Sequence, residues 1–575
     1  MCGIFGIVTQ GPSENLSENQ IKSVFQGLSA RGPDDKKYYS DQNMEFLFTR
    51  LSIIDTEMGM QPHFDTDKDN ITIANGEIYN HREIREKLLK NNRSFRTKSD
   101  IEVIPHLIND YKDSMEWLEI IEGQFAIANW NKKNKKLILA RDRFGKKPLF
   151  YSIIDNSKLI FSSDFITLLK ILPNKMSIDN EALNYYLNFN YIPAPYSIDT
   201  RVRKLGAGEY LIFNGGKIIR KKYYDINQVA RRSMGNSVKN IKEAYELFKI
   251  HFENSVQKRL LMDVKYSLFL SGGLDSASIY GAIMNISGLA PPSFTIKFED
   301  AKYDESEMAF NITEKFQGEQ KIIKIGGNDI IDNFKTHVYS IGEPFGDFST
   351  IPMYILSKNS YENGYKVSFS GDGGDEIFGG YDRYQTSFSQ NRNLKSYINA
   401  LKINNENMGD KVESKFKIFE TKDMVNNYML YDFKTILEGN ILIKSDRMGM
   451  ASSVEIRSPF LDRDLVNFGI NTSSSFKISN GLNKILIRKY LEEMGLNFVL
   501  DKNKRQFTVP FDDILRDSKI SNKLLNNLKF LEKMDKNYHN IVSEYMSGNN
   551  KYFRNVRNIF ALELWYDIIS NEITI

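Results

Sequence analysis

Short apolar stretches separated by turn residues dominate the first part of the chain. They predict strands at residues 45–55, 71–74, 125–130, 136–140 and 149–152, with a turn at 144–148. The first domain is therefore expected to be rich in strands.

The second half has a different pattern. Ala244, Phe248, Phe252, Val256 and Leu260 recur every four residues and predict an amphipathic helix. Apolar strands are predicted after it at residues 266–270, 293–298, 321–325 and 366–369, with helical patterns between them. Strand–helix alternation indicates a parallel sheet with crossover helices. Ligands on such sheets bind at the carboxyl ends of the strands.

Three local features complete this pattern. Residues 227–240 are polar and poor in helix formers, which predicts a linker. Asp100 precedes an apolar run and is typical of a helix cap. Pro105 inside that run is expected to kink or shorten the helix.

Composition narrows the class of protein. A length of 575 residues predicts two or more domains, and 77 Lys and Arg against 73 Asp and Glu indicates neither a nucleic-acid partner nor a membrane surface. No apolar run approaches the roughly 18 residues that span a bilayer. No signal peptide is evident, and the single cysteine excludes an internal disulfide, so we expect a cytoplasmic protein.

A glycine loop follows the strand at 266–270. Ser271-Gly272-Gly273-Leu274-Asp275-Ser276 leads from that strand into a predicted helix at 277–284, which would aim backbone N–H groups at a phosphate. The loop lacks the lysine of a Walker A motif, which favours a pyrophosphate that leaves as a unit. Asp275 could hold a metal ion on the phosphates. A plain strand-to-helix turn is the alternative.

A second loop, Ser370-Gly371-Asp372-Gly373-Gly374-Asp375-Glu376, follows the strand at 366–369. Its three carboxylates would repel one another unless they shared a cation. A solvated acidic loop is the alternative.

Cys2 is the candidate nucleophile. Removal of Met1 would leave it a free α-amino group that can act as the base for its own thiol. Asn75 and Gly76 offer two donors for an oxyanion, and Glu77 could hold an α-ammonium group. The alternatives are a buried structural cysteine and an Asn-Gly hairpin turn.

These strings carry a family resemblance. MCGIFGIV, RGPDD, TRLSI and NGEIYN resemble class II glutamine amidotransferases, and SGGLDS resembles the pyrophosphate loop of ATP pyrophosphatases. With SGDGGDE, KSDRM and VEIRSPFLD, the resemblance to glutamine-hydrolysing asparagine synthetases covers nearly the whole chain. It implies an αββα N-terminal-nucleophile (Ntn) hydrolase domain at residues 1–210 and an α/β ATP-pyrophosphatase domain at 211–575.

The resemblance also implies site residues. Arg50 would bind the glutamine α-carboxylate, although a surface arginine is the alternative, and Asp100 would share the ammonium with Glu77. Asp275 and Asp375 would bind Mg²⁺, and Lys504 would be the catalytic lysine. Asp372 stands where asparagine synthetases often have glutamate, which leaves its reach toward the acceptor open. The implied ATP-binding residues are Leu270, Ser271, Gly272, Gly273, Asp275, Ser276, Ile296, Ser370 and Gly371.

The implied reaction releases ammonia from glutamine at Cys2 and passes it to an acyl-adenylate made from Mg-ATP and a carboxylate. Aspartate is the first acceptor to consider, with sugar acids, peptides and secondary-metabolite carboxylates as alternatives. A tRNA-modifying ATP pyrophosphatase normally needs cysteines near the ATP site, and this sequence has none besides Cys2. A catalytically dead relative is the other alternative, and the intact residues Cys2, Arg50, Asn75, Asp275 and Asp375 argue against it. A homodimer is one candidate assembly.

Overall fold

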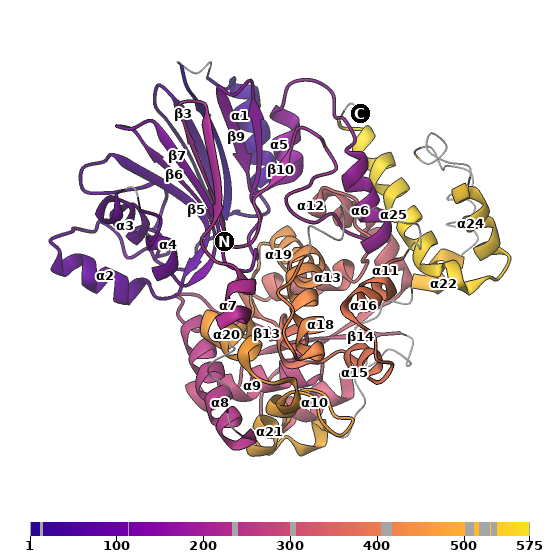
Figure 1. Ribbon diagram of the computed structural model, residues 1–575. Helices are drawn as coiled ribbons and strands as arrows, with labels where there is room; N and C mark the ends of the chain where they lie inside the picture. The colour runs from indigo at the N-terminus through magenta and orange to yellow at the C-terminus, as the bar shows by residue number, and fades with distance from the viewer. Residues whose placement is uncertain are drawn as a thin grey trace.

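The computed structural model describes residues 2–11, 15–112, 114–232, 238, 240–299, 306–403, 417–500, 511–516, 530 and 537–573. Two antiparallel sheets lie face to face in the upper half of the molecule, and a parallel sheet with surrounding helices forms the lower half (Figure 1). This arrangement confirms the predicted order of an αββα domain followed by an α/β domain. Among the described helices, none is both long and apolar enough to cross a membrane.

The first antiparallel sheet carries the amino-terminal strand near its centre. In spatial order its strands are β10 (Arg203–Lys204), β8 (Phe150–Ile154), β9 (Lys158–Ser162), β1 (Cys2–Thr9), β3 (Met44–Arg50) and β2 (Asp35–Ser40). Successive β1 side chains face opposite sides, as strand geometry requires. Ile4 packs into the core between the two sheets, and Phe5 packs toward the outer helices.

The second antiparallel sheet carries Asn75 to Glu77. Its strands are β12 (Lys217–Lys222), β11 (Glu209–Asn214), β7 (Lys136–Arg141), β6 (Gly123–Asn131), β5 (Asn70–Ile78) and β4 (His63–Phe64). Strand β11 crosses position 210 and β12 lies entirely beyond it, so residues of this sheet continue past the expected domain division.

Helices cover the outer face of each antiparallel sheet. The first sheet is covered by α1 (Glu18–Leu28) and α5 (Phe165–Ile171), and the second by α2 (His81–Lys90), α3 (Val103–Tyr111) and α4 (Trp117–Ile120). Ser17 and Gln20 form a capping box that begins α1.

The parallel sheet places its glycine loop on the central strand. Its order is β15 (Gln320–Ile325), β14 (Ser293–Phe298), β13 (Tyr266–Phe269), β16 (Val367–Phe369) and β17 (Glu455–Arg457). The loops after β13 and β16 therefore lie side by side, because these two strands are parallel neighbours.

Helices pack on both faces of this sheet. One apolar cluster includes α8 (Ile241–Arg259), α9 (Leu274–Ser287), α10 (Ser306–Lys315), α20 (Arg463–Asn471) and α21 (Ile485–Glu493). The other includes α11 (Gly327–Asp332), α12 (Phe334–Ile341), α13 (Thr350–Glu362) and α25 (Phe553–Ser570).

Several shorter helices complete the second half. They are α14 (Gly374–Phe378), α15 (Asp382–Ser389), α16 (Leu394–Leu401), α18 (Met424–Asp432), α19 (Leu442–Ala451), α22 (Phe511–Arg516) and α24 (Asn537–Met546), with a π-helix, η3 (Phe433–Ile441), between α18 and α19. Glu438 on this π-helix reaches the first domain, where it pairs with Arg141 at 3.3 Å.

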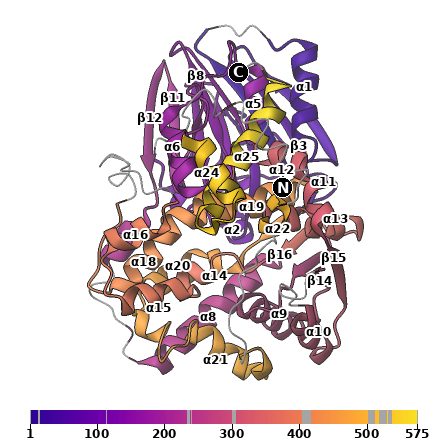
Figure 2. The ribbon, with the colours of Figure 1, turned by 90° about the vertical axis from the view of Figure 1, so that its right-hand side faces the viewer.

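The carboxyl-terminal helix binds the segment that leaves the first domain. Helices α6 (Asn180–Phe189) and α25 lie side by side in both views (Figures 1 and 2). Tyr186 is fully buried, and its hydroxyl donates to the Asn558 carbonyl oxygen at 2.7 Å. The two halves therefore share one apolar core at this contact.

Three local predictions need correction. The linker expected at 227–240 begins with a helix, α7 (Ile226–Arg232), because Ile226 and Ala230 bury one face. The strand expected at 45–55 ends at Arg50, where the chain turns. Asp100 is not the cap of α3, because the helix begins at Val103 and Glu102 is the residue before it. Pro105 lies in the first turn of α3, where a proline removes no helical hydrogen bond.

Candidate active sites

Cys2 is the first residue of a central strand. Its backbone N–H donates to Asn75 Oδ1 at 3.2 Å, and its partner in the β1–β3 register is Arg50. Burial raises the pKa of the Cys2 thiol. The cysteine is buried in an apolar cluster, as the structural alternative required, but its backbone N–H also contacts the side chain of the predicted oxyanion residue Asn75.

Asn75, Gly76 and Glu77 lie within β5, so the hairpin alternative is wrong. The bond from Cys2 to Asn75 Oδ1 leaves the amide Nδ2 buried without a hydrogen-bond partner among the described residues. Glu77 Oε2 is also buried and has no hydrogen-bond partner among the described residues. A donor and an acceptor on one strand beside a thiol suit the two polar ends of a glutamine-like molecule.

Arg50 is held by backbone carbonyl groups. Its guanidinium donates to the oxygens of Thr56 at 3.2 Å, Ile54 at 3.3 Å and Asp55 at 2.5 Å. With 5% of its surface exposed, it is not the surface arginine of the alternative interpretation. A guanidinium fixed in this way offers a preorganised carboxylate site.

Asp100 completes the first site. It lies beside β5, where its Oδ2 accepts the Ile78 N–H at 2.7 Å. Burial raises the pKa of Asp100 to about 6. The six predicted glutaminase residues therefore come together on β1, the end of β3, β5 and the turn before α3.

An arginine from the second domain reaches this site, which sequence reasoning missed. Arg457 Nη2 lies 3.2 Å from Glu77 Oε1, and Arg457 Nε lies 2.6 Å from Glu455 Oε1. Burial raises the pKa of Glu77, and the carboxylates of Glu455 and Asp100 add to that rise. The proposed ammonium site therefore lies directly on the domain interface.

The Ser-Gly-Gly loop has the predicted strand-to-helix geometry. Helix α9 begins at Leu274, directly after Gly273, and Gly272 has a φ of +76° that favours glycine. Ser271 Oγ lies 3.2 Å from Ser276 Oγ, which ties the loop to the first turn of α9. Leu270 precedes the loop, and Ile296 lies on the neighbouring strand β14.

The two predicted metal ligands converge on one atom. Lys484 Nζ lies 2.5 Å from Asp275 Oδ2 and 2.5 Å from Asp375 Oδ1, so the two oxygens are at most twice that distance apart. A Cβ on Gly374 would lie 2.7 Å from the Asp275 carboxyl carbon, so glycine there permits the approach of the two loops. The solvated-loop alternative is wrong, since Gly373, Gly374 and Glu376 in this loop are buried.

Lys484 was also missed by sequence reasoning. It is the residue before α21, and burial opposes its charge, but Asp275 and Asp375 outweigh burial and raise its pKa. The pair of carboxylates suits a divalent cation whose other ligands would be phosphate and water oxygens. Among the described residues, no group of three or more His, Cys, Asp or Glu side chains forms a complete protein-only metal site.

Asp372 lies at the domain interface. Its Oδ2 accepts the hydroxyls of Ser370 at 2.7 Å and Ser458 at 3.2 Å, and lies 3.5 Å from Lys146 Nζ. Gly371 is adjacent to Asp372 in the same loop, which links the proposed acceptor residue to the ATP-binding residues.

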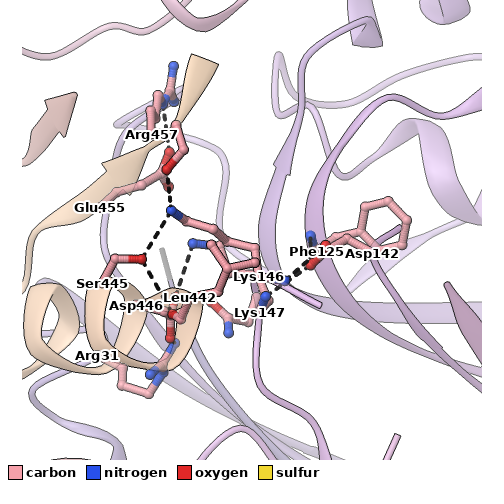
Figure 3. A network of polar contacts seen from close by, with 12 residues as sticks. Arg31, Phe125, Asp142, Lys146, Lys147, Leu442, Ser445, Asp446, Glu455 and Arg457 are labelled. Atoms are coloured by element: carbon pink, nitrogen blue, oxygen red, sulfur yellow. Dashed lines mark hydrogen bonds and ion pairs between the residues drawn. The ribbon is translucent and has the colours of Figure 1, made fainter. Parts of the chain in front are cut away.

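A buried ion network joins the two domains (Figure 3). The Asp446 carboxylate on α19 accepts hydrogen bonds from Arg31 Nη2 at 3.0 Å and from Lys147 Nζ at 3.1 Å. Arg31 Nε also donates to the Cys2 carbonyl oxygen at 3.4 Å. Burial alone would raise the pKa of Asp446, but Arg31 and Lys147 hold it below its usual range. The strand that carries the candidate nucleophile is thus connected to the second domain.

One predicted site residue lies outside the described residues. Lys504, the expected catalytic lysine, falls within 501–510, so its role stays a prediction.

Comparison with known proteins matches both domains. A family model described as asparagine synthase matches residues 247–567, and one described as a glutamine amidotransferase domain matches residues 1–224. The chain is 29% identical to asparagine synthetase [glutamine-hydrolyzing] 1 of Bacillus subtilis, over 99% of this chain and 97% of that relative. It is 28% identical to asparagine synthetase [glutamine-hydrolyzing] 2 of the same organism, over 85% of this chain and 69% of the relative.

Proposed function

The chain belongs to the asparagine synthase family, and on that premise we propose that it converts aspartate to asparagine with glutamine as the nitrogen source and Mg-ATP as the activating nucleotide. Glutamine-dependent amide synthesis itself follows from the two matched domains. The observation that carries the proposal is the convergence of Asp275 and Asp375 beside an exposed Ser-Gly-Gly loop. This arrangement supports adenylation, with loss of pyrophosphate, on one side of the interface and glutamine hydrolysis on the other.

At the first site, the Cys2 sulfur attacks the amide carbon of glutamine after its proton passes to the α-amino group freed by removal of Met1. Asn75 Nδ2 and the Gly76 N–H donate to the oxyanion, the C–N bond breaks, and ammonia leaves with the proton. Water then hydrolyses the thioester to glutamate. Arg50 binds the α-carboxylate, and Glu77 with Asp100 binds the α-ammonium.

At the second site, a carboxylate oxygen of the acceptor attacks the α-phosphorus of ATP, and pyrophosphate leaves onto the N–H groups of the Ser271–Ser276 loop. Ammonia then attacks the acyl carbon, loses a proton, and displaces AMP. Lys484, which pairs with Asp275 beside the Ser-Gly-Gly loop, would neutralise phosphate charge. Asp275 and Asp375 would hold Mg²⁺, which would screen the phosphate oxygens.

The acceptor is tested by pyrophosphate release across a panel of carboxylic acids, with ammonium chloride as the nitrogen source. Release with aspartate at millimolar concentration, together with AMP and asparagine, would support the proposal. Release only with a sugar acid or a peptide carboxylate would move the assignment to that acceptor class. ADP as the product would refute adenylation, because it indicates an acyl phosphate.

Two further proposals concern the setting of the enzyme. The single cysteine supports a cytoplasmic location. A homodimer is the assembly to test first, by light scattering of the purified protein.

A further inference from the structure

Two adjacent lysines of the glutaminase domain point into the synthetase domain. They lie in the turn after β7, where the Asp142 carboxylate accepts the backbone N–H groups of Lys146 at 3.0 Å and Lys147 at 2.9 Å. Asp142 also accepts the Phe144 N–H at 3.1 Å, so the backbone of the turn is held at three points. Lys147 pairs with Asp446, whereas Lys146 reaches a different group of residues.

The partners of Lys146 belong to the proposed acceptor region. Its Nζ donates to Ser458 Oγ at 2.5 Å and Ser445 Oγ at 3.3 Å, and lies 3.5 Å from Asp372 Oδ2. Ser458 in turn donates to the same Asp372 oxygen. Three donors therefore surround Asp372 Oδ2: Lys146 Nζ and the hydroxyls of Ser458 and Ser370. Asp372 Oδ1, in contrast, has no hydrogen-bond partner among the described residues.

This arrangement orients one carboxylate. A side chain fixed through one oxygen presents the other in a defined direction, and here it stands in the loop that also carries Asp375. The Lys146 side chain is 3% exposed, and the Asp372 side chain is 11% exposed. Burial lowers the pKa of Lys146 to about 8, while Asp372 opposes that shift. Removal of this ammonium would leave Asp372 with hydroxyl donors alone.

We propose that Lys146 is a positioning residue of the synthetase reaction, supplied by the glutaminase domain: it holds Asp372 through Oδ2 so that Oδ1 faces the acceptor carboxylate and its incoming ammonia. The proposal rests on the proposed function, since it presumes an acyl acceptor beside this loop. It implies that seating the glutaminase domain completes the second active site, in addition to delivering ammonia to it.

The test separates this role from a structural one. Lys146→Met is compared with Lys204→Met, a matched control, because Lys204 is also a buried lysine of the first domain that pairs with the second, at 2.5 Å from Glu343, without touching the acceptor loop. Both variants are assayed for ATP-independent glutaminase activity and for acceptor-dependent pyrophosphate release with ammonium chloride. Lys146→Gln serves as a second variant if Lys146→Met does not fold.

We expect Lys146→Met to keep glutaminase activity within about twofold and to lose about 10²-fold in kcat/KM for the acceptor, as a misplacement near 1 Å can cause. The KM for ATP should stay unchanged, and Lys146→Arg should recover part of the loss. Lys204→Met should retain ammonia-driven release. In the Asp372→Asn background, Lys146→Met should add little, because both changes remove the same effect.

Equal effects of the Lys146 and Lys204 substitutions on ammonia-driven release would overturn the proposal, and so would additive losses in the Asp372→Asn background. If the parent protein shows no acceptor-dependent pyrophosphate release with any carboxylate in the panel, the proposed function fails first. That result is distinct from a parent that reacts while Lys146→Met reacts equally well, which refutes the role of Lys146 alone.

Discussion

The buried network around Asp446 provides the sharpest test of how the two domains are joined. Asp446→Asn keeps the shape of the side chain and removes its charge. The substitution leaves Arg31 and Lys147 as two buried cations that share a neutral partner. Because the pKa of Asp446 lies below its usual range, the carboxylate of the parent protein is ionised at neutral pH, where the assay is run.

The size of the effect follows from burial. The side chain of Asp446 is 1% exposed, that of Arg31 is 7% exposed and that of Lys147 is 0% exposed. Breaking a buried ion pair by altering one partner destabilises by about 3–5 kcal/mol. Since asparagine can still accept one hydrogen bond, we expect Asp446→Asn to destabilise the domain contact by about 3 kcal/mol. This loss corresponds to a decrease of about two orders of magnitude in the equilibrium constant for docking of the domains.

An exposed ion pair at the same interface supplies the control. Lys366 Nζ lies 2.7 Å from Asp34 Oδ2, and these side chains are 28% and 25% exposed. Asp34→Asn should therefore cost no more than about 1 kcal/mol. The assay measures thermal unfolding and the amount of amide formed per glutamate released. Asp446→Asn should lower both the melting temperature and this ratio, because Arg31 also holds the Cys2 carbonyl.

Identical melting temperatures and identical product ratios for Asp446→Asn and Asp34→Asn would refute this reasoning. A lower melting temperature with an unchanged ratio would confine the network to stability and remove it from ammonia transfer.

Four other substitutions test the sites and the pH dependence of folding. Cys2→Ala should abolish amide formation from glutamine and spare formation from ammonium chloride; loss of both in a folded protein would contradict two separate sites. Lys484→Met should reduce AMP formation, measured by chromatography, by about 10²–10³-fold and leave glutaminase activity intact; unchanged AMP formation would exclude Lys484 from phosphate binding. Lys504→Ala should reduce synthesis with both nitrogen sources by a similar factor without rescue by arginine, and a mild loss would end that assignment. Burial lowers the pKa of Lys477 to about 7, so the unfolded state binds more protons above that pH, and stability should rise by about 2 kcal/mol between pH 7 and pH 9. Lys477→Met should remove that rise in denaturant titrations, and an unaltered slope would show that other groups cause it.

Much of the fold could be predicted because its information is local. The strand predicted at 293–298 matches β14, and the helix predicted from Ala244 to Leu260 matches α8 within a few residues. Period-two and period-four apolar patterns reflect which side of each element is buried. The linker at 227–240 failed because two apolar residues, Ile226 and Ala230, suffice to anchor a short helix.

The convergence of the candidate glutaminase and phosphate residues could be predicted because they stand in contiguous strings, such as Asn75-Gly76-Glu77. The contact of Lys484 with these loops could not be predicted, since Lys484 lies more than a hundred residues after Asp375 and no motif surrounds it in the sequence. Arg457 and Lys146 were missed for another reason. Each contacts residues across the domain interface, and the partner of a side chain in another domain is set by the packing of whole domains.

The contact between α6 and α25 has a consequence for synthesis on the ribosome. Tyr186 and the backbone of Asn558 that receives its hydroxyl are separated by 372 residues. At about 5–20 residues per second, translation needs about 20–75 s to supply that partner. During this interval the part of α6 around Tyr186 lacks the cover of α25, and the nascent chain exposes it to chaperones and to other unfinished chains. The final helix thus ends a period of aggregation risk that the first domain cannot end by itself.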